Sequence, residues 1–255
     1  MQRRLAFVIA VSLAFPVCAW ADFQAEYQVT KQGGDVPALS RIEVGGGQMR
    51  MDAGKVGMLF DTSAGRVLVL QNDKRTYMDM QKIADTTSAA MAQANAALAN
   101  LPPEQRAMIQ QRMGAAMAGA GAKLEVSVTP TGASDRVAGY SCEVYRTDIG
   151  GRHREDTCLA DVSAAGIPGA DHATVRKAFE QMKALGEKMS AGMFHSPVNQ
   201  LPPDKFPVRI THYDDAGNPT QVVELKSIAV SSVPSGDFAV PAGYTEQQID
   251  THGRR

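Results

Sequence analysis

The stretch GQMRMDAGKVGMLFDTSAGRVLVLQNDKRTYMDM, residues 47–80, decides the expected fold. Polar and apolar residues alternate over residues 48–52, as in a strand with one buried face. Residues 66–70 carry apolar side chains on both faces, which predicts a central strand. Because these segments recur about every ten residues, with Gly- or Asx-rich turns between them, they predict an antiparallel meander.

Strand patterns continue on both sides of this stretch. The other expected strands span residues 23–29, 40–44, 123–129, 139–146, 153–160, 207–213 and 220–228. Two helical regions interrupt them, one near residues 86–118 and one near residues 171–190. The first is rich in alanine and has no charge before Glu104; the second has one apolar stripe and Asp171 as its expected cap. We therefore expect one α+β domain, with roughly eight to eleven antiparallel strands and both helical regions on one face.

The first 21 residues have the features of a secretory signal peptide. Two arginines precede the apolar segment 5–15, and Ala19-Trp20-Ala21 supplies a small-x-small cleavage pattern. The segment is short for a bilayer span of about 20 residues, which makes a retained anchor the less favoured alternative. We expect cleavage after Ala21 and a periplasmic protein that keeps no transmembrane span.

Cleavage would leave two cysteines, Cys142 and Cys158. In an exported chain such a pair predicts one disulfide. Residues 139–146 and 153–160 resemble a hairpin, and a three-residue loop at 149–151 would place the two sulfurs directly opposite each other. A redox-active pair is the alternative, but the spacing is not Cys-x-x-Cys.

Composition and motifs exclude several classes of protein. With 26 Lys and Arg against 27 Asp and Glu, the chain has no basic excess for nucleic acid. It lacks the Gly-x-Ser-x-Gly, His-Glu-x-x-His and phosphate-loop motifs, and its five histidines share no ligand spacing. His153 and Asp156 could act together, yet they lie in an ordinary polar hairpin. We expect no enzyme activity, no metal site and no cofactor.

The methionines admit two interpretations. Met49 and Met51, and likewise Met78 and Met80, would lie on one face of a strand because strand period is two. Thioethers bind Cu(I), so a copper-binding protein is one hypothesis. Methionine also fills irregular apolar cores and cavities, and this is the favoured interpretation.

Several short motifs occur in a characteristic order. They are GQMRMD at 47–52, FD at 60–61, RVLVL at 66–70, KRTY at 74–77, VAGYSCEVY at 137–145, CLA at 158–160 and FAVPAGY at 238–244. The series resembles an uncharacterised family of exported bacterial proteins, a domain of unknown function, and its pattern is also similar to the lipoprotein-carrier superfamily. The resemblance implies a single half-barrel domain over residues 22–245, a curved antiparallel sheet with helices covering its hollow face, and a polar tail at 246–255.

The expected function is to bind or carry an apolar ligand, such as a lipid or a lipoprotein acyl chain, in the periplasm. A curved sheet has a hollow face that helices or a ligand must fill. The expected lining residues are Phe23, Tyr27, Met49, Met51, Phe60 and Tyr77. The uncharged helical segment could act as a lid. The main alternative is a helix-plugged interaction module of the envelope that binds no ligand and makes peripheral contacts only.

Overall fold

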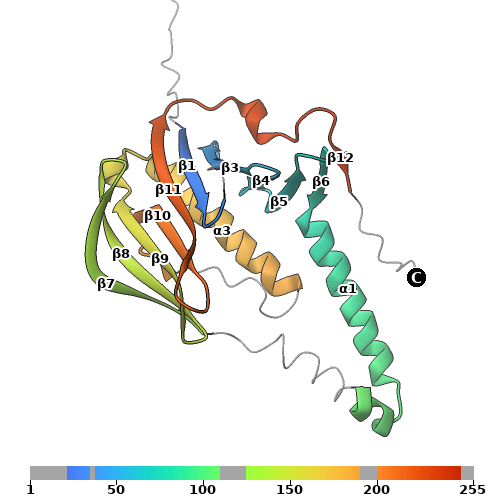
Figure 1. Cartoon of the computed structure of the whole chain (residues 1–255). Helices are drawn as coiled ribbons and strands as arrows, with labels where there is room; N and C mark the ends of the chain where they lie inside the picture. Colours follow the sequence, from blue (N-terminus) through green and yellow to red (C-terminus); the bar gives the residue numbers. More distant parts are fainter. Residues whose placement is uncertain (1–21, 35–37, 110–124, 190–199, 248–255) are drawn as a thin grey trace, which may run out of the picture.

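The structure, a computed structural model, describes residues 22–34, 38–109, 125–189 and 200–247. Within these ranges the strands form one sheet, in the order β12-β6-β5-β4-β3-β2-β1-β11-β10-β9-β8-β7 (Figure 1). Neighbouring strands are antiparallel except β12 and β6, which are parallel. The strands are β1 (Phe23–Lys31), β2 (Ala38–Gly45), β3 (Gln48–Ala53), β4 (Val56–Asp61), β5 (Arg66–Gln71), β6 (Thr76–Asp79), β7 (Val126–Val137), β8 (Tyr140–Ile149), β9 (Arg152–Asp161), β10 (Lys205–Tyr213), β11 (Pro219–Val230) and β12 (Thr245–Glu246).

Two long helices accompany the sheet, α1 (Met80–Ala99) and α3 (Gly169–Met189), together with the short 3-10 helices η1 (Ser163–Ala165) and η3 (Ser235–Phe238). The α+β class and the open, curved, mostly antiparallel sheet are thus confirmed, with twelve strands in the described ranges rather than eight to eleven. The expected signal peptide, the end of the first helical region and most of the expected tail lie outside the described residues. Across the ranges that the structure covers, no helix is both long and apolar enough to cross a bilayer.

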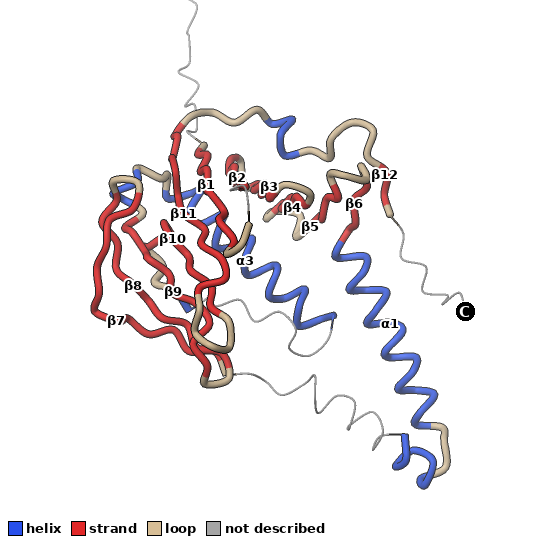
Figure 2. The backbone as a smooth tube through the Cα atoms, viewed as in Figure 1, coloured by secondary structure: helices blue, strands red, loops and turns tan. Residues whose placement is uncertain are grey.

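The main core lies on the concave face of the sheet. Along the meander, Met49 pairs with Val44 and Phe60, and Phe60 pairs with Val67, so these side chains share one face. All four are at most 2% exposed. The helix α3 covers this face and adds Ala178 and Leu185 to the same core (Figure 2). The period-two pattern of the sequence therefore groups these residues on one face, and the structure identifies that face as the inward one.

The strand β5 is buried on both faces, as its sequence predicts, but it is not central. It is third from one edge of the sheet. Its outward residues Leu68 and Leu70 are covered by Tyr244 and Val240 from the end of the described chain. The outer face of β5 is apolar because this C-terminal segment, which crosses the convex side of the sheet, covers it (Figure 1).

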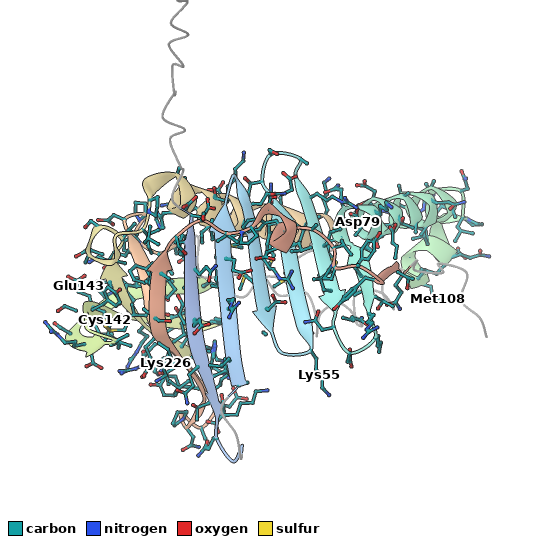
Figure 3. All side chains as sticks on the ribbon, turned by 90° about the horizontal axis from the view of Figure 1, so that it is seen from above. Lys55, Asp79, Met108, Cys142, Glu143 and Lys226 are labelled. Carbon is teal, nitrogen blue, oxygen red and sulfur yellow. A yellow bond between two sulfur atoms is a disulfide. The ribbon has the colours of Figure 1, made fainter. Side chains whose placement is uncertain are left out.

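The first helix differs from the expectation in both its start and its direction. Asp79 caps it, since its Oδ1 accepts hydrogen bonds from the backbone N–H groups of Gln81 (3.1 Å) and Lys82 (3.4 Å). The helix therefore begins at Met80 rather than near residue 86. Only Ala84 is buried in α1, and the rest extends away from the sheet toward Met108 (Figure 3). Alanine offers little apolar area to bury, so this segment does not cover the concave face as expected.

The disulfide between Cys142 and Cys158 is present, but the register of its hairpin was predicted wrongly. Gly150 and Gly151 form a two-residue turn with φ of +60° and +74°, and a bulge follows between β8 and β9. Cys142 therefore pairs with Ala160 rather than with Cys158. The sulfurs meet diagonally across the ladder, with 5.4 Å between the two Cα atoms. Both cysteines are buried in the main core.

Replacing both cysteines by alanine should lower the free energy of unfolding by about 3 kcal/mol, because the cross-link restricts the unfolded chain. Urea unfolding of the oxidised protein and of the double variant measures this difference. Reductant should destabilise the natural protein by a similar amount and leave the double variant unchanged. Equal stability of the variant and the oxidised protein would contradict a structural role for the bond.

Candidate functional site

An apolar cavity of about 310 Å³ lies between the concave face of the sheet and the first half of α3. The strands that form its floor are β1, β2, β3, β10 and β11, and the loop before β10 closes one side. Its lining residues are Phe23, Ala25, Tyr27, Ser40, Ile42, Met51, Ile167, His172, Val175, Arg176, Phe179, Leu201, Pro202, Lys205, Phe206, Pro207, Ile210, Val223 and Ile228. The volume is at the lower end of the usual range for small-molecule sites.

The polar group deepest in this wall has a partner. The Tyr27 hydroxyl donates a hydrogen bond of 3.0 Å to the backbone oxygen of Pro207. Burial raises the pKa of Tyr27, so the phenol stays a neutral donor. The contact connects β1 to β10 beside the cavity. The Tyr27 hydroxyl is therefore already paired and does not require a ligand as its partner.

Basic residues of the cavity wall come from α3 and β10. His172 is half-buried, and burial lowers the pKa of its imidazole, which favours the neutral ring near pH 7. The Lys205 ammonium forms ion pairs with Glu143 (3.3 Å) and Asp161 (3.2 Å), whereas its stem contributes to the wall. Arg176 lines both the cavity and an outer groove of α3.

Three of the six residues predicted to line a cavity do so: Phe23, Tyr27 and Met51. Met49 and Phe60 lie on the same concave face, but both are buried in the packed core rather than at the cavity. Tyr77 lies on the opposite face of the sheet. It pairs with Leu70 and packs against it in the smaller outer cluster.

Of the remaining candidate pairs, the second methionine pair is separated, whereas His153 and Asp156 are in contact. Met78 ends up on β6 and Met80 starts α1, so the second methionine pair is not on one strand. His153 Nε2 lies 2.8 Å from Asp156 Oδ1, and the Tyr213 hydroxyl donates to the other carboxylate oxygen. In the described residues, no group of three or more His, Cys, Asp or Glu side chains is arranged to hold a metal.

Sequence reasoning missed the contribution of the second half of the chain to the cavity. Val175 and Phe179 belong to the apolar stripe of α3, and that stripe was the available signal. Ile210 and Val223 face the cavity from paired positions of β10 and β11. Their strands were predicted, but nothing in the sequence says that β11 pairs with β1.

Residues 68–244 match the family described as a domain of unknown function, DUF4412. The chain belongs to this family. The family match includes α3, β10 and β11, and it begins after the first four strands. Among curated proteins, no sequence matches the chain.

Solved structures resemble this DUF4412 chain at low sequence identity. An uncharacterised conserved protein from Thermus thermophilus has 8% identity and a TM-score of 0.45, with 89% of each chain covered. In the MucA/MucB complex of Pseudomonas aeruginosa, a chain with 12% identity and a TM-score of 0.36 aligns with 88% of this chain over 56% of its own length. PNGF-II has 9% identity and a TM-score of 0.40, and 90% of this chain aligns with 31% of it.

A buried carboxyl lies at the start of α3, next to the cavity residue His172. Asp171 is 6% exposed, and its Oδ2 has no hydrogen-bond partner among the described residues. It lies inside the first turn rather than at the expected cap position, because the helix already begins at Gly169. Burial, and secondarily the charge of Asp22, raise the pKa of Asp171 from 3.8 to about 6. The ionised form therefore destabilises the folded protein.

The folded-state pKa of Asp171 is above its unfolded value, so the folded protein binds this proton more tightly. Stability should fall as pH rises between about 4 and 6 and stay low above that range. Asp171→Asn should flatten this step and raise the free energy of unfolding at pH 8 by up to about 3 kcal/mol. Urea unfolding from pH 4 to 8 tests this, with Asp73→Asn in an exposed turn as the matched control. A loss of stability at pH 8 in Asp171→Asn would contradict the prediction.

Proposed function

We propose that this protein binds a single apolar chain, such as the acyl chain of a lipid or lipoprotein, in the cavity under α3 and carries it through the periplasm. The observation that carries the proposal is the cavity of about 310 Å³ between helix and sheet. Its wall is built almost wholly from aliphatic and aromatic side chains, and the deepest hydroxyl, that of Tyr27, is already satisfied. Such a wall favours hydrocarbon over a polar ligand.

The packing of α3 supports this function. Ala178, Met182 and Leu185 belong to or pack against the core, which fixes the helix on the sheet. Phe179 lines the cavity, and Val175 contacts both the core and the cavity. The helix therefore forms one wall of the cavity while the core holds it in place.

A second candidate is an interaction module of the envelope that binds no ligand. The observation in its favour is the exposed, uncharged part of α1, where Met91 is 42% exposed and no charge occurs between Asp85 and Glu104. An uncharged, alanine-rich helix surface that is exposed to solvent is available for contact with another protein. An empty cavity in the native protein would favour this candidate.

Native mass spectrometry of protein from a periplasmic extract should show a bound mass that solvent extraction removes and that lipid analysis identifies. Val175→Trp should fill the cavity and weaken uptake of a fluorescent fatty-acyl probe by about ten-fold, because the indole occupies ligand space. Ala173→Trp, at an exposed position of the same helix, is the control and should bind as the natural protein does. A ligand-free mass together with no probe uptake would refute the carrier function.

The periplasmic location is part of the proposal, and the disulfide supports it because such bonds persist in oxidising compartments. Intact-mass measurement of the exported protein should give the mass of residues 22–255 less two hydrogens. Alkylation without reductant should leave the mass unchanged. Retention of residues 1–21, or two alkylated thiols, would contradict export with a formed disulfide.

A further inference from the structure

The charged residues of the cavity wall are all of one sign. The basic side chains that line it are His172, Arg176 and Lys205, and no described Asp or Glu lines it. An apolar cavity whose charged lining residues are all basic favours an amphiphile with a negatively charged polar end.

Two of the three basic groups offer no free positive charge near pH 7. The Lys205 ammonium is held by Glu143 and Asp161, and burial lowers the pKa of His172, which favours its neutral ring. The Arg176 side chain, by contrast, makes no hydrogen bond and no ion pair with any other described residue, although Glu180 lies one helical turn away in the outer groove. Among the residues that the structure covers, the guanidinium of Arg176 is thus the basic group of this wall whose N–H donors have no partner.

The position of Arg176 suits the head of an amphiphile. The residue borders the apolar cavity on one side and the solvent-open groove of α3 on the other, where Lys183 and Glu187 also lie. A head bound there would stay in contact with water while the tail entered the cavity. The planar guanidinium matches carboxylate and phosphate oxygens in a two-point contact.

We propose that Arg176 binds the anionic head, carboxylate or phosphate, of a single-chain amphiphile whose tail occupies the cavity. This inference rests on the proposed function. A volume of about 310 Å³ accommodates one chain more readily than two. The charge of Arg176 then selects anionic over neutral or cationic amphiphiles of the same chain length.

Isothermal titration at pH 7.5 with dodecanoate, dodecyl phosphate, dodecanol and dodecyltrimethylammonium, each below its micelle concentration, tests the inference. The two anions should bind about ten-fold more tightly than dodecanol, and the cation more weakly still. Arg176→Gln should remove the advantage of the anions while the affinity for dodecanol is unchanged. Arg176→Lys should retain part of that advantage, and Lys177→Gln, at an exposed neighbouring position, should retain all of it. Which anion binds more tightly distinguishes a fatty-acid source from a phospholipid source.

The outcomes separate this inference from the function on which it rests. Equal affinity of the natural protein for dodecanoate, dodecyl phosphate and dodecanol would overturn the role of Arg176 and leave a carrier of apolar chains intact. An anion preference that survives in Arg176→Gln would also overturn it. Binding of none of the four amphiphiles would refute the proposed function itself. Thermal unfolding of each variant confirms that the comparison is made between folded proteins.

Discussion

The curvature of the sheet is the constraint on which the rest of this structure depends. Register shifts occur in the pairing of β1 with β11, of β9 with β10, and of β8 with both its neighbours. Bulges of this kind bend strands and increase their twist. The bent sheet has a concave face that its own side chains do not fill, so a helix must cover it. The helix α3 supplies that cover, and the cavity lies between its first half and the strands β1, β2, β3, β10 and β11.

The two faces of the meander are closed by different parts of the chain. On the concave side, Gln181 of α3 donates hydrogen bonds to the backbone oxygens of Asp61 (3.4 Å) and Thr62 (3.2 Å) at the end of β4. On the convex side, Arg50 donates to the backbone oxygen of Asp237 (2.8 Å) and pairs with Asp52. The C-terminal segment is thereby fixed over β3, β4 and β5. The cavity lies on the concave side only, between α3 and the strands β1, β2, β3, β10 and β11.

Local sequence patterns predicted the strands well where apolar and polar residues alternate and only one face of the strand is buried. Met49 and Phe60, two of the residues expected on the hollow face, are buried there. The patterns failed at boundaries where a side chain acts on the backbone. Asp79 ends β6 and starts α1 because its carboxylate caps the helix, and Arg66 pairs with the same carboxylate at 3.0 Å. The Gly150–Gly151 turn shifted the hairpin register, since two positive φ values close a shorter loop than the sequence spacing suggested.

The sequence by itself determined the strand-rich α+β class, the identity of the disulfide partners and the alternation that places Phe23 and Tyr27 on one face of their strand. These features depend on composition and on the alternation within single strands, which are local properties. Only the tertiary structure decided that α3 rather than α1 covers the concave face, that Tyr77 faces outward under Tyr244, and that Arg176 borders the cavity. Those outcomes depend on which distant elements meet, such as β1 with β11. Local periodicity cannot predict that pairing, because the pairing arises from packing between segments about 200 residues apart.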